Sequence, residues 1–450
     1  MNPTQDTLDL VKGALALPDD QISKTISTAT GLVAYDLQAP AKNLYPFVTP
    51  IRNALPRVGG GTGVATNWRQ VTALIGSGFD AMGWVPEGQR SGQMAYATAS
   101  KSASYVTIGE EDAVTYEAIS AARYFEDVQA RMTFRLLQKM MLKEEMAILA
   151  GNASLQLGTP ATPALSASGS GATLPAATYS VIVAALTLEG YQNSSIAAGL
   201  ATTKTITGAD GKTFVLNGGS SNRSNNATQA VTSGQALFAS VTAIQGAVAY
   251  AWYVGAVGSE SLQAITTINS AAFSAPLAAG QQAATAITAD NSANPNYAYN
   301  GLLTTALSAG SNAYVNILGT GTAGTGTFLT ASGRGSVNEI DTMFQTMWSN
   351  YQLSPTVLYV NVQELRNITS KVLSNASGPL LRYNVGEDAN PYDLAAAGAL
   401  SYYFNPFALN GGLRIPIRIH PLGRKPADPV PVERGAERRR SEDAAGLLPD

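Results

Sequence analysis

The sequence predicts an α+β fold in which a strand-rich segment, one long helix, a second strand-rich region and a mixed region follow one another. Three observations carry this prediction. Apolar residues recur at helical spacing across 111–150, short β-favouring runs alternate with turns across 153–295, and a helix, a strand and a second helix occur between 336 and 373. With 450 residues, 45% of them hydrophobic, the chain is long enough for about two to four domains with real cores.

The first 110 residues predict an arm followed by a long β-hairpin. Residues 1–50 are mixed and polar, with three prolines near their end, and we expect an N-terminal arm. Within 51–110, the runs 68–75 and 103–108 favour strands, and the glycine-rich stretch 76–92 predicts the tip of an extended hairpin loop. An isolated two-stranded ribbon is marginally stable. It is therefore expected to lie on another surface, most simply that of a neighbouring copy.

Residues 111–150 predict one continuous helix, about 60 Å long at 1.5 Å per residue. Its apolar stripe consists of Val114, Ala118, Ala121, Phe125, Val128, Met132, Leu136 and Met140. Acidic residues from Glu110 to Glu117 crowd its start and basic residues lie toward its end, as the helix dipole favours. Gly151 supplies a stop. Because no partner helix is adjacent in the sequence, distant segments or neighbouring subunits are expected to pack against it.

Residues 153–295 predict a β-sandwich. Only seven charged residues occur there, and Ala, Ser, Thr and Gly dominate. The expected strands are 178–187, 213–216, 236–244, 248–254 and 262–268. Tyr250, Trp252 and Val254 alternate along one run and share a face that would anchor the core. Disorder is the alternative for such a simple composition, but the aromatic and β-branched runs favour the sandwich.

The region 296–425 predicts mixed helices and strands. Ser336 and Glu339 have capping-box spacing just before an apolar helical face. A short strand at 356–360 follows, and Asn361 then offers a cap for a second helix.

The end of the chain predicts one more strand and a tail. The run 413–419 alternates aliphatic residues with Arg and Pro, and Pro416 indicates an edge position because proline lacks the N–H of a sheet ladder. Residues 426–450 are rich in Pro, Arg and Glu, and we expect a disordered tail.

The composition excludes several kinds of chemistry. There is no cysteine and only one histidine, His420, so thiol catalysis, cysteine zinc sites and two-histidine metal motifs are excluded. The net charge of -3 gives no reason to expect nucleic-acid binding by the whole molecule. We expect no enzyme activity, no cofactor and no metal. The N-terminus shows no signal-peptide pattern and no run has membrane character, so we expect a protein made in the cytoplasm without a membrane partner.

In this order, the segments resemble the major capsid protein of tailed double-stranded DNA bacteriophages, the Hong Kong 97-like fold. Residues 68–108 resemble its extended loop, 111–150 its spine helix and 343–373 part of its axial domain. The resemblance implies these segments: 1–50 N-terminal arm, 51–110 extended loop, 111–152 spine helix of the peripheral domain, 153–295 inserted immunoglobulin-like or fibronectin-like sandwich, 296–425 axial domain with the remaining peripheral strands, and 426–450 tail.

The resemblance implies a structural function. Many copies would assemble as hexamers and pentamers into an icosahedral shell around packaged double-stranded DNA, with portal, scaffold or decoration proteins as further partners. The protein would then reside in the virion capsid after assembly in the host cytoplasm. An encapsulin-type compartment shares this fold and differs in cargo. A β-sandwich surface adhesin is the alternative from another class, which the absence of a signal peptide and the long charged helix disfavour.

Arg131, Arg135, Lys139 and Lys143 step by four along the predicted helix and form a basic ridge. A solvated face is the simpler interpretation, supported by Asp127 one turn before Arg131. The functional interpretation is an inward surface that contacts DNA phosphates without regard to sequence.

Lys101, a glycine string and His420 also each have a functional and a simpler interpretation. Lys101 lies on the returning strand of the hairpin, and some members of the resembled family cross-link a loop lysine to a neighbour's asparagine, which needs a desolvated lysine and a nearby carboxylate. Gly319, Gly321 and Gly324 match a dinucleotide-binding string, but no helix is expected to follow, so we expect a flexible loop. His420 has no catalytic partner pattern and is interpreted as structural.

Overall fold

The computed structural model describes most of the chain between residues 47 and 421. The described residues are 47–59, 61–75, 84–93, 95–123, 125–332, 335–374, 400–409 and 412–421. With 23% helix and 30% strand, the fold is compatible with the predicted α+β class. Nearly all of the predicted arm and the whole predicted tail lie outside the described residues. Of the described residues, 112–135 belong to one compact unit, and 47–111 with 136–421 belong to a second.

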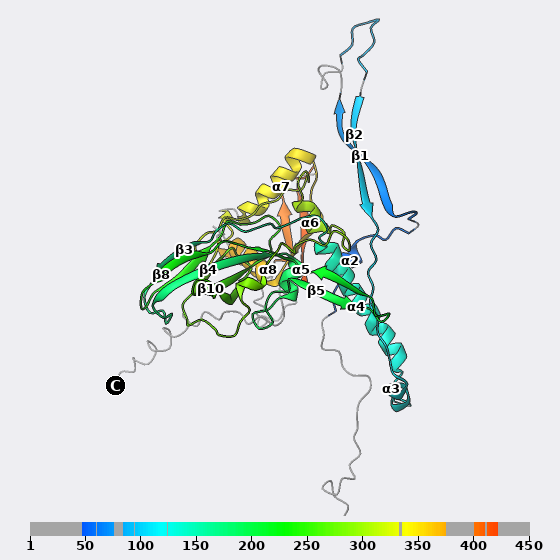
Figure 1. Cartoon of the computed structure of the whole chain (residues 1–450). Helices are drawn as coiled ribbons and strands as arrows, with labels where there is room; N and C mark the ends of the chain where they lie inside the picture. Colours follow the sequence, from blue (N-terminus) through cyan, green and yellow to red (C-terminus); the bar gives the residue numbers. More distant parts are fainter. Residues whose placement is uncertain are drawn as a thin grey trace, which may run out of the picture. The chain divides into compact units, whose positions relative to one another are not determined.

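The predicted hairpin is formed by β1 (Ala65–Ile75) and β2 (Ala95–Ser104), which pair antiparallel (Figure 1). The first predicted strand, 68–75, is confirmed. The second, 103–108, is wrong beyond Ser104, because pairing with β1 rather than local propensity decides where β2 lies. A short helix that the sequence did not predict, α2 (Pro50–Ala54), precedes the hairpin and has proline in its first turn.

The prediction of one helix over 111–150 is wrong. The structure has α3 (Tyr116–Ala121) and α4 (Val128–Ala150), which is 23 residues or about 35 Å long. The break between them ends at the second of two side-chain caps. The Thr115 hydroxyl accepts a hydrogen bond from the Ala118 N–H at 3.3 Å, and Asp127 accepts one from the Ala130 N–H at 3.0 Å. A polar cap therefore starts each helix, although the apolar spacing runs on through the turn between them.

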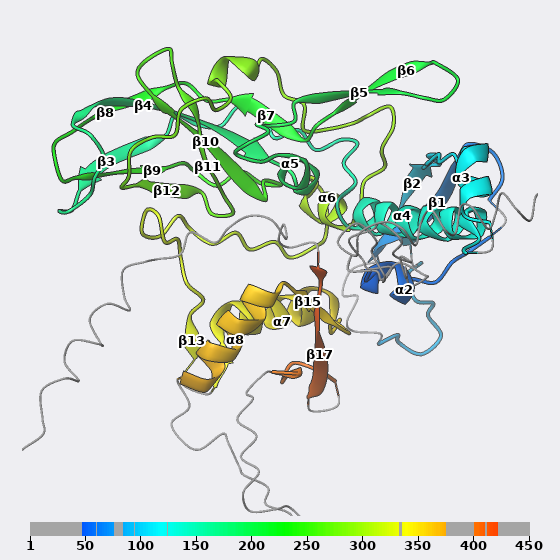
Figure 2. The same ribbon diagram turned by 90° about the horizontal axis from the view of Figure 1, so that it is seen from below.

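Eight strands between residues 164 and 273 form two facing sheets, the two-sheet region (Figure 2). One sheet has the order β11-β10-β4-β7, with β8 also pairing with β4, and the other has the order β12-β9-β3. The strands are β3 (Ala164–Ser168), β4 (Ala177–Leu186), β7 (Ser220–Arg223), β8 (Ala227–Val231), β9 (Ala236–Ser240), β10 (Ala249–Gly255), β11 (Ser261–Thr266) and β12 (Ser270–Phe273). Four of the five predicted strands correspond to β4, β9, β10 and β11.

The core of the two-sheet region lies between its sheets. Tyr250, Trp252 and Val254 of β10 are all buried in it, which confirms the predicted shared face. The opposite face of β10 is also buried, by a second apolar cluster that includes Tyr191 of α5 (Leu188–Asn193). The fifth predicted strand, now β6 (Thr213–Asn217), lies outside the two sheets because it pairs with β5 (Thr203–Thr207) as a separate hairpin.

The C-terminal region combines two helices with short strands. The elements are α6 (Leu302–Leu307), β13 (Ala331–Ser332), β14 (Ser336–Val337), α7 (Asn338–Tyr351), β15 (Leu358–Val360), α8 (Val362–Ser374), β16 (Tyr402–Asn405) and β17 (Leu413–Ile419). Phe344 of α7, Ile368 of α8 and Ile415 of β17 share a core. The predicted Asn361 cap is confirmed, since its side chain accepts from the Glu364 N–H at 2.6 Å.

Two local predictions in this region are wrong. The capping box is not formed: Ser336 donates to Asp341 at 2.5 Å, and the Glu339 carboxylate accepts from the Thr330 N–H at 3.0 Å. Pro416 is not on an edge strand, because β17 lies between β15 and β16. Residues of β17 up to Pro416 pair with β16 and those after it pair with β15, so the proline stands where the strand changes partner.

Candidate functional site

The β1–β2 hairpin presents apolar side chains on both of its faces. Trp68 and Val71 are three residues apart before the register shift and so point to opposite faces, yet they are 49% and 57% exposed. Tyr96 of β2 is 64% exposed. Neither face of the hairpin is therefore covered by the rest of the described chain.

A buried carboxylate fixes the N-terminal end of the hairpin. Glu145 of α4 is 1% exposed and accepts hydrogen bonds from the N–H groups of Ile51 and Arg52 in α2, at 2.9 and 2.6 Å. The same carboxylate lies 2.8 Å from Nε2 of His420. The N–H of His420 donates to the carbonyl of Val360 in β15 at 2.8 Å, so the joint also reaches the C-terminal sheet. His420 is structural, as interpreted from the sequence, but nothing in the sequence indicated its partner.

Glu144, next to this joint, strengthens the same attachment near the surface. It accepts from Arg52 Nε at 2.7 Å and pairs with Arg57. Burial alone would raise the pKa of Glu144, but the hydrogen bonds from Arg57 and Arg52 outweigh it and hold the pKa below its usual range. Glu144 is therefore ionised under all conditions near neutrality.

At the C-terminal end of the hairpin the signs of the charges are reversed, because here α4 supplies the cations and the hairpin side supplies the carboxylate. Glu110 forms ion pairs with Lys139 and Lys143, and Lys143 Nζ also donates to the carbonyl of Gly109 at 3.3 Å. The hydrogen bonds from Lys139 and Lys143 lower the pKa of Glu110. Glu110, which the sequence placed among the acids at a helix start, is instead an anchor.

These contacts correct the predicted basic ridge. Lys139 and Lys143 are engaged with Glu110, and Arg131 pairs with Glu126. Arg135 is exposed and has no ion pair with any described residue. An open row of four cations is therefore absent from the described part of α4, because three of them already face carboxylates.

Lys101 lies on β2, directly opposite Trp68, and its side chain is exposed. With Trp68 and the neighbouring residues of both strands, it lines a shallow hollow of about 540 Å³. No carboxylate of the described chain pairs with Lys101. The acidic group that a cross-linking reaction needs is therefore not supplied by the described residues of the same copy.

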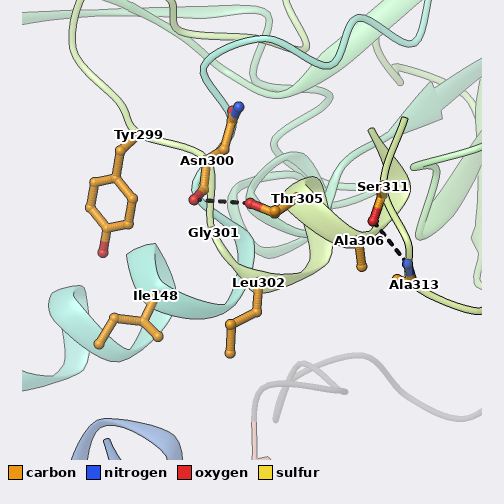
Figure 3. A pocket seen from close by; sticks show the side chains of 9 residues that line it. All are labelled: Ile148, Tyr299, Asn300, Gly301, Leu302, Thr305, Ala306, Ser311 and Ala313. Carbon is orange, nitrogen blue, oxygen red and sulfur yellow. Dashed lines mark hydrogen bonds between the residues drawn. The ribbon is translucent and has the colours of Figure 1, made fainter. Parts of the chain in front are cut away.

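A second hollow, of about 390 Å³, lies where the end of α4 meets the segment around α6 (Figure 3). The side chains of Ile148 and Leu302 line it, and Tyr299 flanks it. Burial, together with the charge of Glu144, raises the pKa of the Tyr299 hydroxyl. The nine described lining residues include no carboxylate, lysine or histidine, so the hollow offers no acid-base pair.

The glycine string at 319–324 forms a turn. The N–H groups of Thr325 and Gly326 both donate to the carbonyl of Thr322, and the Gly324 N–H donates to Ser270 Oγ at 3.0 Å. These backbone N–H groups are occupied within the chain, so the turn lacks the open cradle that a phosphate requires.

No family model, curated protein or solved structure matches the chain. The exposed hairpin and its anchors along α4 are therefore the features of this chain that bear on its function. Within the described residues, no helix combines the length and apolar character that crossing a membrane requires.

Proposed function

We propose that this chain is a major capsid protein whose copies assemble into an icosahedral shell around a bacteriophage genome. One observation carries the proposal: the hairpin exposes Trp68, Val71 and Tyr96, and no second layer covers it within the described residues. A two-stranded ribbon is marginally stable alone and gains stability by burying such side chains. A second copy of the chain would supply the missing surface.

Repetition of that contact would build the shell. A hairpin that lies on a different surface of the next copy makes a heterologous contact, and such contacts form rings when their rotation closes. Hexamers and pentamers are the rings proposed here, and the assembled virion capsid is the proposed location. The Hong Kong 97-like arrangement of loop, helix and axial domain is the proposed architecture.

The ends of the two-sheet region support its role as an inserted immunoglobulin-like module. Gly301 N–H donates to the carbonyl of Gly151 at 2.8 Å, and Asn294 N–H donates to the carbonyl of Asn152 at 2.8 Å. The Asn152 side chain also donates to the carbonyl of Ser292 at 2.8 Å. A module whose two ends are adjacent can be inserted without displacing its host fold. It would decorate one surface of the shell.

Packaged double-stranded DNA is the proposed content, held by non-specific contact. Arg135 is the ridge residue best placed for this role, since it is exposed and the other three cations have carboxylate partners. A contact of so few charges would be weak and salt-sensitive. We expect Arg135→Glu to lower genome retention without preventing shell assembly.

Electron microscopy and sedimentation of the purified full chain test the proposal. Uniform closed shells are expected, and persistent monomers would overturn it in favour of the adhesin alternative. Shells that enclose protein cargo instead of DNA when isolated from infected cells would favour an encapsulin-type compartment.

A matched pair of variants tests the role of the hairpin. Trp68→Glu, in β1, is expected to abolish closed shells because it places a charge in the proposed contact. Val257→Glu changes a residue that is 64% exposed in a turn of the two-sheet region, and it should assemble normally. Normal assembly of Trp68→Glu would contradict the proposed contact.

A further inference from the structure

The two ends of the β1–β2 hairpin are attached to the same helix by bonds of different character. At the N-terminal end, Glu145 is 1% exposed and holds two backbone N–H groups of α2 as well as His420. Water and salt do not reach such a contact easily, so it is weakly screened. This end of the hairpin is a fixed joint.

The C-terminal end depends on ions that water reaches. The side chains of Lys139 and Lys143 are 60% and 43% exposed, and both converge on Glu110, whose own side chain is 15% exposed. Ion pairs whose cations are in contact with water weaken as salt concentration rises, because mobile ions screen each charge. Glu110 therefore holds this end by a contact that solution conditions can loosen.

The segments between these anchors and the strands leave the hairpin little other support. An added Cβ at Gly59, Gly63 or Gly109 would meet no atom within 4 Å, so the chain runs through open space at these points. Gly63 also has φ +78°, which allows the backbone to turn where other residues would be strained. The Tyr105 N–H donates to the carbonyl of Val64 and closes the ribbon just before this stretch. Gly61, between these open points, packs against Tyr105 of the ribbon itself. Beside Glu110, Glu111 also accepts a hydrogen bond from the Ala209 N–H at 3.2 Å. The contacts that hold the ribbon within the described chain therefore lie at its two ends.

We propose that the contact of Glu110 with Lys139 and Lys143 is a releasable catch, and that its release lets the hairpin turn about the fixed Glu145 joint. Charge screening opens the catch, whereas the buried joint keeps the hairpin attached. The orientation of the hairpin is then controlled by ionic strength. This is a property of the single chain and holds whether or not the chain builds a shell.

The absence of cysteine makes a direct distance measurement practicable. Ser102→Cys in β2 and Leu137→Cys in α4 place a spin label on each side of the catch, both at exposed positions. Dilution of the labelled full chain with unlabelled chain restricts pulsed dipolar measurements to distances within one copy. The distance distribution is recorded at about 0.01 M and about 1 M NaCl, between which the screening length falls from about 30 Å to about 3 Å.

We expect a narrow distribution at low salt that becomes about twofold broader at high salt, as screening of an exposed ion pair requires. Glu110→Gln should be broad at both salt concentrations. Glu87→Gln is the matched control, because Glu87 is exposed and has no ion pair with a described residue, and it should behave as the unaltered chain does.

A charge-swapped variant separates loss of the catch from any other effect of changing Glu110. Glu110→Lys combined with Lys139→Glu and Lys143→Glu restores opposite charges at the same positions and should recover the narrow low-salt distribution. Equal widths at the two salt concentrations in the unaltered chain, or a narrow distribution for Glu110→Gln, would overturn the proposal.

Discussion

The two-sheet region and the β1–β2 hairpin are both antiparallel β-structures, yet one buries its tryptophan and the other leaves its tryptophan half exposed. Trp252 of β10 is 0% exposed, whereas Trp68 of β1 is 49% exposed. The two sheets of the two-sheet region face each other, and β10 is buried on both sides. The hairpin has no second layer in the described chain. The difference separates a region that has its own core from a ribbon whose apolar side chains stay exposed within the described chain.

The largest expected effect lies in the two-sheet region. Trp252→Ala should destabilise it by about 3–5 kcal/mol, since the change removes a fully buried aromatic side chain and leaves a cavity. It also removes the hydrogen bond from Trp252 Nε1 to Thr266 Oγ1 at 2.8 Å. Chemical denaturation, monitored by hydrogen exchange across residues 164–273, measures the loss of unfolding free energy. A change below about 1 kcal/mol would contradict the view that this region depends on its own core.

The next effect concerns the joint at the base of the hairpin. Glu145→Ala should lower the free energy of unfolding by about 3 kcal/mol, because it removes the buried carboxylate that His420 and two backbone N–H groups contact. Glu144→Ala, one residue away and nearer the surface, should cost less than about 1 kcal/mol. Thermal unfolding of both variants provides the comparison. Similar losses for the two would show that burial does not distinguish the fixed joint from its exposed neighbour.

A smaller loss is expected in the C-terminal region, which resembles the two-sheet region in having its own core. Tyr403 donates to Asp341 Oδ1 at 3.0 Å and accepts from the Val337 N–H at 2.8 Å, and burial raises the pKa of its hydroxyl. Tyr403→Phe should cost about 1–1.5 kcal/mol, the usual net worth of a hydrogen bond. Denaturant titration measures this loss of unfolding free energy. A loss above about 3 kcal/mol would indicate that the hydroxyl supports more than these bonds.

Lowering the pH should break the contact of Glu110 with Lys139 and Lys143 and leave the buried core intact. The pKa of Glu110 is lowered in the folded chain by Lys139 and Lys143, so the contact is complete above the ordinary carboxyl pKa and is lost as the pH falls through the lowered value. The spin-label distances across the catch should therefore broaden as the pH falls below the ordinary pKa of a glutamate and through the lowered pKa of Glu110. Glu144 titrates in the same direction, so Glu110→Gln isolates the contribution of Glu110. A distribution that stays narrow in acid would contradict this assignment.

The sequence predicted correctly those features that depend on residues close together in the chain. The alternation of Tyr250, Trp252 and Val254 located a buried face, because side chains alternate along a strand. The Asn361 cap was found because its acceptor and its N–H partner are three residues apart. The break between α3 and α4 was missed because the apolar spacing continues past it, while Asp127 competes with continued helix by accepting from the Ala130 N–H and starting α4. A periodicity count does not weigh that competition.

The anchors of the hairpin could not be found in this way. Glu110 and Lys139 are 29 positions apart, and Glu145 and His420 are 275 positions apart. In the sequence, Glu110 belongs to a run of acidic residues, and Lys139 and Lys143 belong to a regular basic row. Each set therefore suggests a solvated helix surface by itself. Only the folded chain brings the two sets together, so that Lys139 and Lys143, two of the four residues of the predicted basic ridge, attach the hairpin through Glu110.

The smallest effect on the stability of the single chain should come from the matched tryptophan of the hairpin. Trp68→Ala repeats the Trp252 substitution in a strand that no described part of the chain covers, so it leaves no cavity and should change stability by less than about 0.5 kcal/mol. The same variant should nevertheless reduce association between copies, because Trp68 is proposed to be buried only there. Denaturation of the dilute chain and sedimentation of the concentrated chain give the two measurements. A large loss of single-chain stability would mean that the ribbon packs within its own copy and that the contrast with the two-sheet region fails.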